Sequence, residues 1–517
     1  MTDRGLTTLG AADERPAIVE PSLGVVSYAA LDRLADRVAS RLQASGVRPG
    51  ARVGLYVRRS SDAVAAMLGV LRAGGAYVPV DPRAPVERIA GIHADCRIDT
   101  SFVEERFEPA YRAALGRATG REVPMQTLGP IGLGRGIETW AERGGELVRP
   151  APDTAAATHA TSGARALACL LYTSGTTGRP KGWMMTRSAI EAHARWCHEL
   201  LKPTRDDVFA NHAQFNFGMS LFDIYSSLTC GARLVLVPDE IRQHGGFVAD
   251  LWARERVSIW FSGPAILSLV AGAPDLAARD LSALRVVAFA GEVFPLPQLN
   301  ALRARLPQPR YFNFYGSTEA NVAAFWEVPR GMVLDERPPI GRPCRHYEAR
   351  ICNEGGEAVT PGTVGELRLR GGGLDAGYWA QPPAAEAGNG WFRTGDLAVE
   401  LPSGDLRFAG RIGRMIKLRG YRVEPGEIES RLYQHAQIKE VGVVPFGEPG
   451  GLELVAHVST TTGQRLPLVE LRQFCAVTLP AYMIPARFEF HDSLPKTSSG
   501  KIDLQSLGGH SSSGFDA

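Results

Sequence analysis

The segment best equipped for chemistry is a run of glycines and hydroxyl residues at 171–182, which reads LYTSGTTGRPKG. It follows an apolar run typical of a strand and precedes a run with the apolar spacing of a helix. Glycines and hydroxyl groups let backbone N–H groups and side-chain donors approach phosphate oxygens, and Lys181 adds a positive charge. Pro180 precedes this lysine and no Ser or Thr follows it, so the segment is not a Walker loop. It therefore predicts a phosphate-binding loop of another kind.

The elements around this loop are those of an α/β protein. Residues 26–80 alternate helix-like and strand-like runs in the order expected of a parallel α/β layer, and the alternation resumes after residue 165. The stretch 115–165 is rich in Gly, Ala and Thr and is predicted to be loop or an abbreviated subdomain. From about residue 345, short alternating strands with glycine turns predict an antiparallel β unit.

A compact α+β block follows this β unit. We therefore expect a large N-terminal domain over 1–412, with two α/β subdomains plus a β-barrel-like unit. A small C-terminal α+β domain is expected over 413–517.

Composition excludes several classes of protein. The 517 residues are 44% hydrophobic and 22% charged, which is enough apolar material for a large core and excludes wholesale disorder. The net charge of +2 gives no electrostatic reason to expect a nucleic-acid or membrane partner. The seven cysteines include no CxxC pair, which indicates a reducing compartment. With no signal-like N-terminus and no apolar run of about 20 residues, a cytoplasmic location is expected.

The phosphate loop resembles the signature of the adenylate-forming superfamily, which includes acyl-CoA synthetases, luciferases and adenylation domains of nonribosomal peptide synthetases. Seven further segments resemble motifs of that superfamily in the same order; they are LRAGGAYVPVDP (71–82), NFYGSTEAN (313–321), GELRLRGGGLDAGYW (365–379), WFRTGDL (391–397), GRIGRMIKLRGYRVEPGEIE (410–429), LPAYMIP (479–485) and LPKTSSGKID (494–503). The resemblance implies ATP-dependent, Mg²⁺-dependent adenylation of a carboxylic acid with release of pyrophosphate, followed by thioester formation.

The resemblance also implies roles for single residues around ATP. The expected ATP-binding loop residues are Thr173, Ser174, Gly175, Thr176, Thr177 and Lys181. Thr318 and Glu319 are expected beside the α-phosphate, with Glu319 as the Mg²⁺ ligand, because that ion prefers hard oxygen donors. Lys501 matches the mobile-domain lysine that bridges the substrate carboxylate and the α-phosphate during adenylation.

Other matches concern the nucleoside and the second half-reaction. Tyr315 is expected to stack on adenine, and Asp396 to accept hydrogen bonds from both ribose hydroxyls with support from Arg411. The resemblance implies that the C-terminal domain is mobile and swings about a hinge between the two half-reactions. Relatives usually have Asp or Lys at the hinge, whereas this chain has Gly413, which can absorb a large backbone change but offers no side chain to lock either state. After the swing, Lys417 and Gly420 would face the incoming thiol arm.

Residues 214–228 carry the main departure from the family pattern. Amino-acid-activating relatives have an Asp after the phenylalanine that corresponds to Phe217, and here that position is Gly218. A buried ammonium without its counter-ion costs several kcal/mol, so an ordinary α-amino acid is disfavoured. The acid could lack an amine, as aryl and fatty acids do. Alternatively, its amine is at the β-carbon and pairs with Asp223, or an α-amine meets an acid on another wall.

The predicted pocket is apolar and aromatic, which suits a hydrophobic or aromatic acid. Its expected residues are Phe217, Gly218, Met219, Phe222, Asp223, Phe261, Ala288, Ala290, Phe314, Val322 and Ala323. We favour a resemblance to stand-alone β-amino-acid adenylation enzymes of macrolactam pathways.

The acceptor is expected to be the phosphopantetheine thiol of a separate acyl carrier protein, since no carrier segment follows residue 503. Coenzyme A is the alternative acceptor. A non-catalytic nucleotide-binding scaffold is the alternative from another class, and the presence of Lys501, Glu319 and Asp396 argues against it.

Overall fold

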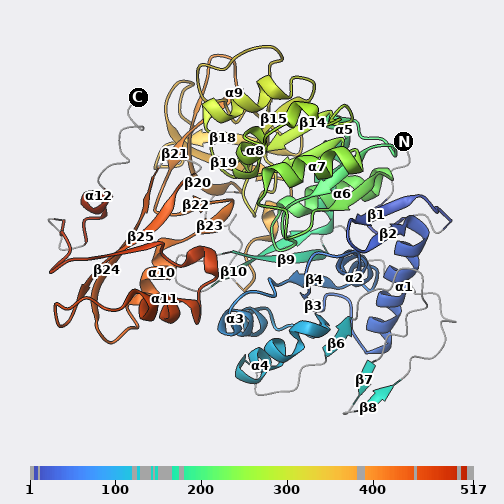
Figure 1. Cartoon of the computed structure of the whole chain (residues 1–517), viewed down its shortest axis with the longest axis horizontal. Coiled ribbons are helices and arrows are strands. Elements are labelled where there is room, and N and C mark those ends of the chain that lie inside the picture. The colour runs from blue at the N-terminus through green and yellow to red at the C-terminus, as the bar shows by residue number, and fades with distance from the viewer. Residues whose placement is uncertain are drawn as a thin grey trace.

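The fold was described from a computed structural model of the chain. It describes residues 5–9, 12–118, 125–128, 141–143, 146–148, 166–173, 180–380, 390–447, 451–497 and 502–508. A large N-terminal part stacks sheets and helices in layers, and a smaller C-terminal part lies beside it (Figure 1). Among these residues, no helix combines the length and the apolar character needed to cross a lipid bilayer.

The largest sheet has nine strands, and six adjacent ones, from β15 to β1, run parallel. Its order is β17 (Arg342–Pro343), β16 (Ala324–Val328), β15 (Arg310–Tyr315), β14 (Val286–Phe289), β13 (Ile259–Ser262), β11 (Val208–Asn211), β12 (Arg233–Leu236), β1 (Pro16–Glu20) and β2 (Gly24–Ser27). The central strands are buried along their whole length, which explains their continuous apolar sequences.

The second sheet has six strands and contains the layer expected over 26–80. Its order is β10 (Lys181–Thr186), β9 (Leu167–Thr173), β4 (Ala76–Pro79), β3 (Arg52–Tyr56), β5 (Thr100–Glu104) and β6 (Met125–Leu128). Five strands run parallel, and β10 is antiparallel to β9. The predicted α/β fold is therefore confirmed. The phosphate loop, however, joins two strands and not a strand and a helix.

Helices cover these two sheets. They are α1 (Tyr28–Ala44), α2 (Ser61–Arg72), α3 (Val86–Cys96), α4 (Glu108–Ala118), α5 (Arg187–Leu201), α6 (Met219–Cys230), α7 (Gly245–Glu255), α8 (Pro264–Ala271) and α9 (Leu296–Arg305). Helix α6 is almost wholly buried and packs against α5, β11, β12 and β13. Ser227 and Thr229 are tolerated in it because their hydroxyls donate to carbonyls one turn earlier, those of Asp223 (2.6 Å) and Tyr225 (2.5 Å).

The predicted β unit is a four-stranded antiparallel sheet. It consists of β18 (Tyr347–Cys352), β19 (Gly365–Gly371), β20 (Phe392–Glu400) and β21 (Leu406–Arg411). Among the described residues it does not close on itself, so the expectation of a barrel-like unit is corrected to an open sheet. Within 115–165 the described residues include a short hairpin of β7 (Ala141–Arg143) and β8 (Glu146–Val148).

The C-terminal part contains a hairpin and a three-stranded sheet with its own apolar core. The hairpin is β22 (Ile416–Leu418) and β23 (Tyr421–Val423), and the sheet is β24 (Ile438–Phe446), β25 (Glu453–Thr460) and β26 (Arg487–Phe490). Its helices are α10 (Pro425–Leu432), α11 (Leu468–Ala476) and α12 (Leu504–Leu507). Gly413 is exposed with φ of 93°, in the region that favours glycine, so its role as a hinge stays a physically reasonable prediction.

Candidate active site

A pocket opens where the carboxyl ends of β11, β13, β14 and β15 meet the hairpin of β22 and β23. In parallel α/β sheets, ligands bind at this edge. The lining residues are Tyr172, Thr173, Asn216, Phe217, Gly218, Met219, Phe261, Ala290, Gly291, Gly316, Ser317, Thr318, Asn321, Val322, Arg411, Met415, Lys417, Gly420, Arg422 and Tyr482. The pocket therefore combines residues from the nine-stranded, six-stranded and four-stranded sheets of the N-terminal part with residues of the C-terminal part.

The phosphate side of the pocket is built on the β9–β10 hairpin. Thr173 ends β9 and Lys181 begins β10, and the two residues are direct partners in the antiparallel register. The loop between them contains Ser174, Gly175, Thr176 and Thr177, which lie outside the described residues. The Thr173 hydroxyl is buried and has no hydrogen-bond partner among the described atoms, so it is available to a ligand oxygen.

Glu319 lies in the turn that follows β15 and is only 3% exposed. One of its oxygens, Oε1, accepts hydrogen bonds from the Tyr378 hydroxyl and from Arg422 Nη1, the latter at 2.8 Å. Burial alone would raise the pKa of Glu319, but Arg422 and Tyr378 more than compensate and lower it to about 2. The carboxylate is thus ionised at neutral pH, and its buried Oε2 has no hydrogen-bond partner among the described atoms. This donor fits Mg²⁺, which would reduce the negative charge around the α-phosphate.

Asp396 joins the antiparallel sheet to the nine-stranded sheet. It is 2% exposed and accepts hydrogen bonds from the Tyr315 hydroxyl (2.6 Å) and from Arg411 Nη1 (2.6 Å). Arg411 is its direct partner in the β20–β21 register and also lines the pocket. The expected contact of Asp396 with ribose hydroxyls and the stacking of Tyr315 on adenine stay predictions, but the three residues do lie together.

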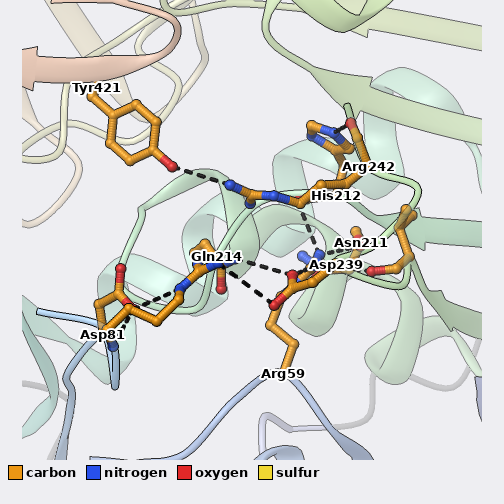
Figure 2. Close-up of polar contacts among 10 residues, drawn as sticks. Arg59, Asp81, Asn211, His212, Gln214, Asp239, Arg242 and Tyr421 are labelled. Atoms are coloured by element: carbon orange, nitrogen blue, oxygen red, sulfur yellow. Dashed lines mark hydrogen bonds and ion pairs between the residues drawn. The ribbon is translucent and has the colours of Figure 1, made fainter. Parts of the chain in front are cut away.

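The hairpin of β22 and β23 faces the pocket and contacts the N-terminal part. The backbone N–H of Gly420 donates to Glu292 Oε1 at 2.6 Å, and Lys417 lines the pocket, where burial lowers the pKa of its ammonium. Tyr421 accepts a hydrogen bond from Arg242 Nη2 at 3.1 Å, as Figure 2 shows. The structure thus places Lys417 and Gly420 at the pocket, and their expected role toward the thiol arm stays a prediction.

Lys501 lies outside the described residues. The described segment that follows Lys501 packs on the C-terminal sheet. Its Leu504 side chain lies close to Gly442 of β24, since a Cβ added to that glycine would be 2.7 Å from Leu504 Cδ2. The bridging role of Lys501 therefore stays a prediction.

The acid side of the pocket contains about half of the expected residues. Those that line it are Phe217, Gly218, Met219, Phe261, Ala290 and Val322. The others, Phe222, Asp223, Ala288, Phe314 and Ala323, are buried but not among the lining residues. Phe222 packs against Phe261 and Phe314, with ring centroids 4.9 and 5.9 Å apart, so this layer supports the pocket wall from behind.

Asp223 lies on α6, is 1% exposed and is not among the residues that line the pocket. Its Oδ2 accepts a hydrogen bond from Asn211 Nδ2 at 3.1 Å. Burial raises the pKa of Asp223 well above its usual value, with Asn211 and Arg59 acting in the opposite direction.

Sequence reasoning missed Arg422, Tyr378 and Tyr482. All three lie inside motifs named above, but nothing in the local sequence of Arg422 and Tyr378 indicates that both contact Glu319. Tyr482 stacks on Tyr421 with ring centroids 4.1 Å apart, a contact that arises only when the hairpin packs on its own domain.

Comparisons with known proteins agree with this geometry. Residues 9–379 match the AMP-binding enzyme family, and residues 427–501 match the AMP-binding enzyme C-terminal domain. An L-proline–[L-prolyl-carrier protein] ligase of Streptomyces coelicolor is 36% identical, covering 96% of this chain and 93% of the relative. A ligase with the same name from Pseudomonas fluorescens is 34% identical, covering 98% of each protein.

Among solved structures, the amide bond synthetase McbA from Marinactinospora thermotolerans aligns with a TM-score of 0.84. The alignment has 25% identity and covers 98% of this chain and 97% of that one. The matched families, the near-complete coverage and the arrangement around Glu319 lead to one conclusion. This chain belongs to the AMP-binding enzymes of the adenylate-forming superfamily, ligases that use ATP and Mg²⁺ to activate an acid and join it to a thiol.

Proposed function

We propose that this ligase adenylates a hydrophobic or aromatic carboxylic acid without a charged α-amine and transfers it to the phosphopantetheine thiol of a carrier protein. One observation carries the choice of acid. The described residues that line the pocket include no Asp or Glu, whereas Arg411, Lys417 and Arg422 contribute positive charge. A substrate ammonium in this pocket would lose its water without gaining a counter-ion. Burying an unpaired charge in this way costs on the order of several kcal/mol.

The room around Gly218 supports the same proposal. A Cβ on this residue would have its nearest neighbours, Asn321 Oδ1 and Thr318 Cα, at 3.9 Å, which is ordinary van der Waals contact. The backbone does not require glycine either, since φ at Gly218 is −55°. Packing therefore does not explain why the carboxylate found in amino-acid-activating relatives is missing, and the chemistry of the substrate is the better explanation.

The β-amino-acid alternative depends on a displaced carboxylate, for which Asp223 was the sequence candidate. In the structure this carboxyl is not among the residues that line the pocket, and its Oδ2 accepts a hydrogen bond from Asn211. A carboxyl that does not line the pocket is poorly placed to pair with a substrate ammonium. This placement favours an acid without an amine over a β-amino acid.

An α-amino acid is the second candidate, because two relatives of nearly full-length coverage are named as L-proline–carrier protein ligases. For this chain, proline would place a secondary ammonium near Gly218 without the usual carboxylate. The relatives thus favour proline, and the pocket chemistry favours an uncharged acid.

The carrier protein as acceptor is supported by the names of the same relatives and by the hairpin that faces the pocket. Lys417 and Gly420 line the pocket, and we expect the thiol arm to approach the acyl carbonyl beside them. In thioester formation the thiol sulfur bonds to the carbonyl carbon of the acyl-adenylate. AMP leaves with the electron pair of the bond that joined it to this carbon. A cation beside the pocket would stabilise the negative charge of the departing phosphate.

The experiment that tests the acid is ATP–pyrophosphate exchange with aryl, alkyl, β-amino and α-amino acids, L-proline included. We expect aryl or alkyl acids to give the highest kcat/KM, and Asp223→Asn to leave the ranking unchanged. Preference for L-proline would overturn the proposal in favour of the second candidate. Preference for a β-amino acid, lost in Asp223→Asn, would overturn it in favour of the displaced carboxylate.

The acceptor is tested separately, with the preferred acid and either a holo carrier protein or coenzyme A. Mass spectrometry of the acylated carrier and chromatography of acyl-CoA measure the two products. Faster transfer to the carrier supports the proposal, and faster transfer to coenzyme A contradicts it.

A further inference from the structure

Three potential metal ligands converge on the C-terminal sheet, far from Glu319 in sequence. His457 lies on β25, Glu489 on the parallel neighbour β26, and His491 just after β26. His457 and Glu489 are direct register partners, and His491 follows Glu489 by two positions, so all three are on one face of the sheet. Among the described residues, this is the one group of three or more such side chains whose ligand atoms lie within 4.8 Å of one another.

The distances within this group are close to those of a coordination shell. His457 Nδ1 lies 2.9 Å from His491 Nε2 and 3.4 Å from Glu489 Oε2. Tetrahedral zinc with bonds of about 2.0–2.1 Å places its ligand atoms about 3.3 Å apart. The two histidine nitrogens would thus need to move apart by only a few tenths of an ångström for each of them to bind one metal ion.

The contact between the two histidines also suits a metal. The neutral imidazole is the form that ligates metals. Two imidazole nitrogens 2.9 Å apart share a single proton, and a cation can take the place of that proton.

We propose that His457, Glu489 and His491 form a binding site for one divalent cation of the zinc class. Two imidazole nitrogens and one carboxylate favour zinc over Mg²⁺, which prefers oxygen donors, so this site would differ from that at Glu319. Water completes the fourth position. The proposal does not depend on which acid the enzyme activates.

The position of the site suggests what a bound cation would do. Gly442 of β24 is the cross-strand partner of His457, and Ile502 and Leu504 pack against this glycine. After His491, the chain is fastened to β24 by a hydrogen bond from the Leu494 N–H to Glu440 (2.9 Å) and by the Lys496–Glu440 ion pair (2.7 Å). A cation bound at this site would therefore hold the end of β26 against β25. The chain segment that leads to Lys501, the predicted catalytic lysine, begins at this point.

The test uses the full-length, tag-free protein with Co²⁺ as the probe and excess Mg²⁺ to occupy oxygen sites. We expect one equivalent of Co²⁺ to bind with the visible d–d absorption of tetrahedral coordination, and Zn²⁺ to displace it and to raise the melting temperature. His491→Gln and Glu489→Gln should each weaken binding at least tenfold, since even indirect ligand partners change affinity about 10–100-fold.

The matched control is His435→Gln. His435 and Glu470 form a contact of 3.3 Å in the same domain, but with only two ligand groups, so this substitution should leave Co²⁺ binding unchanged. Far-UV circular dichroism and ATP–pyrophosphate exchange verify that the variants are folded. The proposal is overturned if the wild-type protein binds no Co²⁺, or if both ligand variants bind it as tightly as the wild-type protein does.

Discussion

Arg422 Nη1 lies 2.8 Å from Glu319 Oε1, and this ion pair joins the C-terminal hairpin to the turn after β15 across 103 positions of sequence. The same carboxylate is the predicted Mg²⁺ ligand. With the hairpin at the pocket, the guanidinium partly neutralises a charge that the metal would otherwise neutralise. We therefore expect the hairpin of β22 and β23 to enter the pocket more easily once Mg²⁺ has left Glu319. This would favour release of Mg²⁺–pyrophosphate before thioester formation.

The first prediction separates the two half-reactions with Arg422→Met. A hydrogen bond to a charged group contributes about 1.5–3 kcal/mol, so we expect thioester formation to fall roughly ten- to a hundredfold. ATP–pyrophosphate exchange should change much less, because Mg²⁺ can balance Glu319 during adenylation. Single-turnover transfer of the preformed acyl-adenylate and equilibrium exchange measure the two rates.

The control for this prediction is Arg419→Asn, on the same hairpin. Arg419 is exposed and has φ of 51°, a left-handed conformation that Asn tolerates well. This variant removes one positive charge without touching Glu319 and should leave both rates near those of the wild-type protein. An equal loss of both rates in Arg422→Met would contradict the proposed coupling.

The second prediction concerns stability and pH. Glu319 has its pKa lowered from 4.5 to about 2, so the folded state binds this proton more weakly than the unfolded state does. The stabilisation by the ionised carboxylate is therefore complete above about pH 4.5 and is lost as the pH falls toward 2. Urea unfolding of the wild-type protein and of Glu319→Gln should show a difference in unfolding free energy that shrinks over this window. A difference independent of pH would show that the carboxylate charge is not its source.

The sequence was sufficient for the layers of the fold and for about half of the residues that line the acid side of the pocket, but not for contacts set by tertiary packing. The alternation over 26–80 predicted β3 and β4 because parallel buried strands and covering helices have distinct periodicities. The strand β10 was missed because its segment lies between a glycine-rich loop and a strong helix pattern. Motif positions could not separate Phe261, which lines the pocket, from Phe222, which lies behind it, because that difference depends on side-chain direction in the folded core.

The third prediction is a gain of function at Gly218. Because a Cβ fits there without close contacts, Gly218→Asp should fold and supply the missing carboxylate to the pocket. We expect kcat/KM for α-amino acids, L-proline included, to rise at least tenfold and that for the preferred uncharged acid to fall. Gly218→Asn has nearly the same size without the charge and serves as the control. Equal effects of Asp and Asn would show that size and not charge decides the selectivity.

The last prediction concerns Tyr421, which contacts the N-terminal part in two ways, of which Figure 2 shows the hydrogen bond with Arg242. Its hydroxyl accepts the hydrogen bond from Arg242, and its ring meets that of Phe217 edge-on with centroids 5.2 Å apart. Tyr421→Phe removes only this hydrogen bond from a charged guanidinium, which contributes about 1.5–3 kcal/mol, so thioester formation should slow roughly ten- to a hundredfold. Tyr421→Leu also removes the aromatic contacts and should slow it further.

Both Tyr421 variants should retain ATP–pyrophosphate exchange, because adenylation is expected with the hairpin turned away from the pocket. Arg242→Met should match Tyr421→Phe, and the double variant should be no slower than either single variant if the two side chains act only through each other. Additive losses in the double variant would contradict this, since they would mean that Arg242 and Tyr421 act on the thioester step independently.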